Sequence, residues 1–78
     1  MDDKTLLERI HDLVAEEHDL RSQHAALDGE ARHRLDTLER QLDQCWDLLR
    51  QRRAREEVGE DPDEAHERSI DEVESYLQ

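Results

Sequence analysis

Two apolar stripes with heptad spacing, one on each side of an Asp28-Gly29 break, constrain the fold of this 78-residue chain most strongly. Both stripes advance in alternating steps of four and three residues, which is the spacing of a helical seam. The first stripe consists of Leu6, Ile10, Leu13, Leu20 and Leu27, with Glu17 and His24 at its remaining steps. The second stripe consists of Leu35, Leu38, Leu42, Cys45 and Leu49, and Arg52 and Glu56 continue its rhythm. Two long helices with a tight connection lie antiparallel, so we expect an all-α fold built on a two-helix hairpin.

Signals at the helix ends give the expected boundaries of this hairpin. Thr5-x-x-Glu8 matches a capping box and predicts a first helix over 3–27. Asp28 can cap a second helix over 30–58, and Gly59 suits the C-terminal end of that helix. Pairing the two helices about the break brings apolar residues opposite apolar residues along most of the seam.

The residues after the second helix predict an acidic turn over 59–68 and a short third helix over 69–77. Pro62 cannot lie in a helix interior because it lacks the backbone N–H, and Ser69-x-x-Glu72 is a second capping box. The apolar face of the third helix consists of Ile70, Val73, Tyr76 and Leu77. A helix this short is not stable alone, so we expect it to pack near the open end of the hairpin, within one domain over 1–78. The candidate neighbours there are Leu7, Val14, Trp46 and Val58.

A bare hairpin covers only one side of each of its helices, which leaves room for a second copy of the chain. Leu7, Val14, Trp46 and Leu48 flank the two stripes and need a cover. A chain of this length also buries little surface by itself. We therefore expect a homodimer in the form of a four-helix bundle. The net charge of −12 opposes this association, although salt screens the repulsion.

Composition disfavours several classes of partner. Charged residues make up 44% of the chain, and acidic residues outnumber basic ones by 23 to 11. A nucleic-acid binder covers phosphates with cations, and an anionic membrane surface attracts them, so neither partner fits. The single cysteine excludes an internal disulfide, and the sequence has neither a secretory leader nor a membrane-length apolar run. We expect a cytoplasmic protein.

Two Glu-x-x-His pairs are the sharpest metal hypothesis in the sequence. Glu8-x-x-His11 and Glu30-x-x-His33 match the pattern of di-iron helical bundles. Each pair lies beside the seam instead of on it, and one is at the open end while the other is at the turn. About thirteen helical residues, roughly 20 Å, separate them. We therefore expect no metal and no cofactor, and keep a metal-binding bundle as an alternative.

Arg50, Arg52, Arg53 and Arg55 form the only basic cluster. Cations near a helix C-terminus complement the helix dipole, and the acidic residues that follow can neutralise them. The alternative is a docking patch for an acidic partner or for RNA, masked by that acidic stretch. No aromatic residues interleave with the arginines to stack bases, which disfavours nucleic acid.

A few further side chains have both a structural and a functional interpretation. Trp46 belongs to the core in most such positions but would anchor a protein contact if it were exposed. Tyr76 and Leu77 are the other candidate contact residues. Glu17, on the seam, is expected to reach the core edge and pair with arginines such as Arg21 or Arg40. Cys45 lies on the apolar stripe, where a buried thiol is usually inert.

Four segments together resemble a known family. These are the opening Met1-Asp2-Asp3-Lys4-Thr5-Leu6, the run Gln41-Leu42-Asp43-Gln44-Cys45-Trp46-Asp47-Leu48-Leu49-Arg50-Gln51-Arg52-Arg53-Ala54, the Asp61-Pro62-Asp63-Glu64-Ala65 turn, and the closing Val73-Glu74-Ser75-Tyr76-Leu77-Gln78. The chain is similar to small uncharacterised actinobacterial proteins grouped as a domain of unknown function. The resemblance brings no activity and no functional residues. It implies that the C-terminal segment is an ordered part of the fold.

The sequence therefore favours a non-catalytic structural or protein–protein interaction module. Its protein partner is not identified by the sequence. The alternatives are a metal-binding bundle through Glu8, His11, Glu30 and His33, and an RNA- or ribosome-associated factor through residues 50–55. No arrangement of nucleophile and base supports an enzyme.

Overall fold

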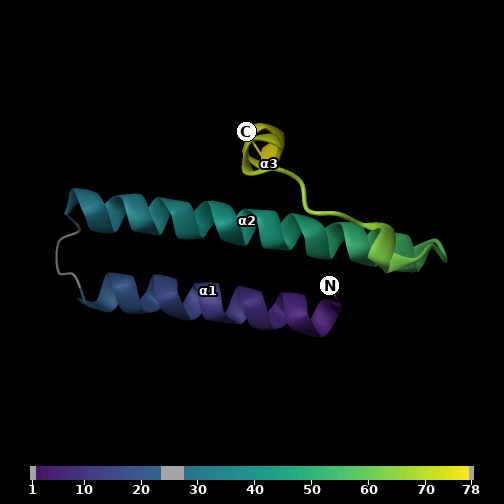
Figure 1. Cartoon of the computed structure of the whole chain (residues 1–78), viewed down its shortest axis with the longest axis horizontal. Coiled ribbons are helices and arrows are strands. Elements are labelled where there is room, and N and C mark those ends of the chain that lie inside the picture. Colours follow the sequence, from purple (N-terminus) through teal and green to yellow (C-terminus); the bar gives the residue numbers. More distant parts are fainter. Residues whose placement is uncertain (1, 24–27, 78) are drawn as a thin grey trace.

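A computed structural model describes residues 2–23 and 28–77 of the chain. The elements in these residues are α1 (Asp3–Gln23), α2 (Gly29–Glu57), the 3₁₀ helix η1 (Pro62–Glu64) and α3 (Ile70–Leu77). Figure 1 shows α1 and α2 running antiparallel beside each other, with α3 against α2 on the side away from α1. The all-α hairpin with a short third helix is thus confirmed. Residues 24–27, which the sequence places in the first helix, lie outside the described residues.

The N-terminus of α1 is capped three residues earlier than the sequence motif predicts. Asp2 Oδ1 accepts a hydrogen bond of 2.8 Å from the Thr5 backbone N–H, and the Asp2 carbonyl accepts one from Leu6. Thr5 therefore lies inside the first turn and does not cap it. The same hydrogen bond from Thr5 lowers the pKa of Asp2, because it favours the ionised carboxylate.

The remaining helix ends follow the sequence signals closely. Asp28 caps α2 by accepting a 2.8 Å hydrogen bond from the Ala31 N–H, as predicted. After α2, Gly59 takes a φ of 77°, the left-handed conformation that favours glycine. Ser69 caps α3 through a 3.2 Å bond from the Glu72 N–H, and its hydroxyl lies 3.4 Å from the Glu72 carboxylate. Pro62 opens a single 3₁₀ turn, where its missing N–H costs nothing.

The main apolar core forms along the predicted seam. Its buried members are Leu6, Ile10, Cys45, Leu48 and Leu49, with Leu13, Leu42 and Ala65 packed against them. Leu38 is fully buried further toward the turn. Ala65 comes from the segment after α2, so that segment closes one side of the hairpin over Leu48. The seam is therefore completed by residues distant in the sequence.

The third helix does not cover the residues that the sequence proposed for it. It packs against α2 and buries Val73, which is 1% exposed. Leu7, Val14 and Trp46 stay 41–45% exposed, and Val58 is 69% exposed. The prediction was wrong because residues 60–69 run back along the side of α2 that carries Leu48, where Ala65 packs, and not along the side that carries Trp46.

Among the described helices, none combines the length and the apolar character that crossing a bilayer requires.

Candidate interaction surface and the strap opposite it

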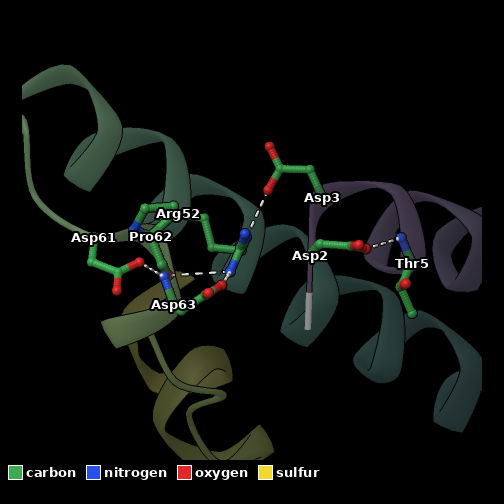
Figure 2. A network of polar contacts seen from close by, with 7 residues as sticks. All are labelled: Asp2, Asp3, Thr5, Arg52, Asp61, Pro62 and Asp63. Carbon is green, nitrogen blue, oxygen red and sulfur yellow. Dashed lines mark hydrogen bonds and ion pairs between the residues drawn. The ribbon is translucent and has the colours of Figure 1, made fainter.

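Arg52 ties three parts of the chain together, as Figure 2 shows. Its Nε donates a 2.6 Å hydrogen bond to Asp3 at the start of α1. One terminal NH group donates to Asp63 Oδ1 at 2.9 Å and to the Pro62 carbonyl at 3.2 Å. Arg52 is 5% exposed, and its hydrogen bonds with Asp3 and Asp63 raise its pKa further above its usual high value. A fixed positive charge therefore holds the start of α1 and the 3₁₀ helix η1 to α2.

The acidic residues after α2 neutralise half of the basic cluster, as expected from the sequence, and the burial of Arg52 removes it from the candidate interaction residues. Arg52 lies inside the intramolecular network, and Arg55 pairs with Glu60 at 2.9 Å and with Glu64 at 3.4 Å. Arg50 and Arg53 are exposed and form no ion pair within residues 2–23 and 28–77. Within the described chain, Arg52 and Arg55 are thus bound, while Arg50 and Arg53 are free to contact a partner.

Residues 60–69, which we call the strap, follow a polar track on α2 that the sequence analysis missed. Gln44 Nε2 donates to the Arg68 carbonyl at 2.8 Å, and Gln51 Nε2 donates to the His66 carbonyl at 3.0 Å. Between them Asp47, only 4% exposed, accepts a 2.9 Å bond from Gln51 and lies 3.6 Å from Arg68. The only sequence feature that could have predicted this track is the spacing of these three polar residues on one face of α2. The same spacing is found on an ordinary solvent-exposed helix face.

Beyond the strap, α3 sets one carboxyl group against another. Glu74 Oε1 is buried without a hydrogen-bond partner in the described chain, and the Asp43 carboxyl lies within hydrogen-bonding reach. This contact, burial and the negative charge of Asp36 raise the pKa of Glu74, while Arg40 opposes the rise. A proton shared between Glu74 and Asp43 would satisfy the orphaned oxygen. The docking of α3 is therefore weakest when both groups are ionised.

The opposite side of the hairpin, which we call the open face, carries the exposed apolar residues. Leu7, Val14 and Arg21 recur every seven residues on α1, and so do Glu39, Trp46 and Arg53 on α2. Arg21 and Glu39 form a 2.9 Å ion pair, which shows that these two rows meet on one side of the hairpin. The strap lies on the other side, where Glu16 pairs with Arg34 and Arg9 reaches Glu67.

The open face differs from the rest of the molecule in charge. The α1 edge of this face follows the spacing three, four, three and contains no acidic residue: Lys4, Leu7, His11, Val14, His18 and Arg21. The α2 edge carries Arg32, Glu39, Trp46, Arg50 and Arg53, while the neighbouring Asp36 and Asp43 lie on the side of α2 that faces Glu74 of α3. This face therefore has no excess of acidic residues, although the whole chain has a net charge of −12.

The candidate metal ligands do not come together. Glu8 and His11 lie exposed near the start of α1, and Glu30 and His33 lie exposed near the start of α2, at the opposite end of the hairpin. Within the described ranges, His, Cys, Asp and Glu side chains form no group of three or more that could hold a metal ion. The geometry thus offers no support for the di-iron pattern.

The other singled-out residues are placed as follows. Tyr76 and Leu77 are 70% and 51% exposed, and Arg68 lies over the Tyr76 ring at 5.9 Å. Glu17 is half-buried at the seam, but the arginines expected to pair with it bind other carboxylates. Cys45 is buried, and desolvation raises the pKa of its thiol. His24 lies outside the described residues.

These features define a class of small all-helical protein: a hairpin strapped on one side by its own acidic C-terminal segment. The chain belongs to the family described as "Protein of unknown function (DUF2630)", whose model matches residues 2–78. Uncharacterised proteins of Mycobacterium bovis and Mycobacterium tuberculosis are 51% identical over 77 residues, covering 95% of this chain and 88% of each relative. These matches confirm the resemblance seen in the sequence. No solved structure matches the chain significantly.

Proposed function

We propose that the chain is a non-catalytic protein–protein interaction module of the cytoplasm. Its binding surface is the open face, and its partner presents an amphipathic helix with an apolar stripe. The observation that carries the proposal is the exposure of Leu7, Val14 and Trp46 together on a side of the hairpin that the strap leaves uncovered.

Chemistry of the surface supports a helical partner. Scattered exposed apolar residues are ordinary on a protein surface, but Leu7 and Val14 lie seven residues apart on α1 and Trp46 lies on the same side of α2. Trp46 lies near the middle of α2 and is flanked by charged residues, in the manner of an apolar anchor with a polar rim. A helix whose apolar stripe covers these three residues would add a layer to the hairpin.

Site-specific photo-cross-linking tests the proposal in the native host. A benzophenone amino acid replaces Trp46 in one variant and Ala15, an exposed residue of α1 off the open face, in the control. We expect an adduct only at position 46, and peptide sequencing should place it on a segment with helically spaced apolar residues. Absence of an adduct at position 46, or equal adducts at both positions, would overturn the proposal.

A further inference from the structure

We propose that the occupant of the open face is a second copy of this chain. The two copies stack with α2 antiparallel to α2 of the second copy, and a two-fold axis passes beside Trp46. This inference rests on the proposed function and names the partner of the same face.

The shape of the molecule favours a stacked pair. Its extents are 48 × 26 × 14 Å, so the hairpin is a plate about one helix layer thick. Stable domains bury their apolar faces between two layers of secondary structure. In this plate, no described part of the chain covers the face that carries Leu7, Val14 and Trp46.

The open face is also self-complementary in charge. Glu39 and Arg53 lie seven residues before and after Trp46, or about 10.5 Å along the helix in each direction. When two α2 helices face each other antiparallel about Trp46, Glu39 of each copy meets Arg53 of the other. The axis therefore creates two opposite-charge contacts around an aromatic centre. Arg53 has no ion-pair partner in the described chain and is free to make this contact.

The residues on the α1 edges of the two copies are also compatible with this two-fold axis. The Arg21–Glu39 and Asp3–Arg52 pairs fix the register of the hairpin, and this register places Trp46 level with the stretch between Leu7 and Val14. The same two-fold axis then brings Leu7 of one copy opposite Val14 of the other. A like-signed net charge does not oppose the contact locally, because the α1 edge of the face contains no acid.

A different stacking, with α1 over α2 of the second copy, fits less well. By the same register, Lys4 of one copy would then meet Arg53 of the other, and Trp46 would lose its symmetric position. A like-charge contact at an interface costs affinity and disfavours that arrangement. The same register would also bring Arg21 of each copy to Glu39 of the other, so it is the Lys4–Arg53 repulsion together with the symmetric position of Trp46 that favours the first stacking.

A charge-reversal mixing experiment tests the axis. Glu39→Arg alone gives two Arg–Arg contacts across the axis, and Arg53→Glu alone gives two Glu–Glu contacts. An equal mixture forms a heterodimer in which both contacts again join opposite charges. Both positions are exposed, so each variant should keep the helical content of the wild type, checked by circular dichroism. Sedimentation equilibrium of the full chain and the fluorescence of Trp46, the only tryptophan, measure association.

The expected result is a dissociation constant raised about tenfold or more in each variant alone, and recovered to near the wild-type value in the mixture. A mixture as weak as its components would overturn the axis, and so would variants that associate like the wild type. A wild-type chain that stays monomeric at every concentration would overturn the second copy as occupant. The cross-linking at position 46 then reports separately whether the face binds a different protein, so the two proposals can fail independently.

Discussion

Replacement of Arg52 by methionine removes the contacts that hold the start of α1 and the 3₁₀ helix η1 to α2. Methionine keeps the apolar stem and the helix propensity of the site, so the loss is confined to the ion pairs and hydrogen bonds. Breaking a buried pair costs about 3–5 kcal/mol when the abandoned partner stays buried. Here Asp3 and Asp63 keep side-chain exposures of 37% and 69% and regain water, so solvent screening reduces the cost. We expect a loss of about 2 kcal/mol, near the value for hydrogen bonds to charged groups.

Urea unfolding followed by circular dichroism measures this loss, with all variants at one protein concentration because association would add stability. A loss of about 2 kcal/mol corresponds to a fall of roughly 8–16 °C in melting temperature for a domain of this size. Hydrogen exchange should also quicken at Asp63 and Glu64, because the strap loses its anchor while α2 remains.

The matched control is Arg50→Met, two residues away on the same helix. Arg50 is exposed and forms no ion pair within the described residues, so at a protein concentration at which the chain is monomeric its replacement should change the free energy of unfolding by less than about 0.5 kcal/mol. Equal stabilities of Arg50→Met and Arg52→Met would refute the role given to the network around Arg52.

Three further predictions concern other parts of the chain. Because the contact with Asp43 raises the pKa of Glu74, docking of α3 weakens as the pH rises above the ordinary Glu value of 4.5. Glu74→Gln should therefore slow amide exchange in α3 at pH 7, and unchanged or faster exchange would contradict this. Asp28→Ala should cost about 1 kcal/mol in urea unfolding through loss of the α2 cap, with a loss near zero counting against that cap. Burial raises the thiol pKa of Cys45, so a thiol reagent at pH 8 should label it slowly until the chain unfolds; rapid labelling of the native protein would show that the thiol is accessible.

Heptad spacing was sufficient to predict the hairpin, because each stripe has one face to bury and the short break leaves one way to pair them. The same spacing also indicates that Arg52 lies on the seam, because this residue continues the second stripe. Because of its charge and its arginine neighbours, the sequence interpretation assigned Arg52 to the basic cluster and not to the core. Only the return of Asp63 toward α2 turns a seam position into a buried ion-pair site.

The path of the strap could not be read from the sequence in the same way. Residues 60–69 have no repeating pattern, and two of the contacts that fix their path are backbone carbonyls bound by Gln44 and Gln51. A glutamine on a helix surface gives no sign of whether it faces water or a neighbouring carbonyl. The sequence placed Leu7, Val14 and Trp46 on an uncovered flank but grouped Leu48 with them, whereas the path of the strap buries Leu48 and leaves the other three exposed.

The molar mass of the chain in solution tests the central claim most directly. Sedimentation equilibrium would compare the wild type with Trp46→Gln on the open face and Tyr76→Gln on α3, two exposed aromatic residues. We predict that the wild type and Tyr76→Gln approach twice the 9.3 kDa mass of one chain as concentration rises, while Trp46→Gln stays near 9.3 kDa. A mass of 9.3 kDa for the wild type throughout, or equal masses for the two variants, would contradict the account.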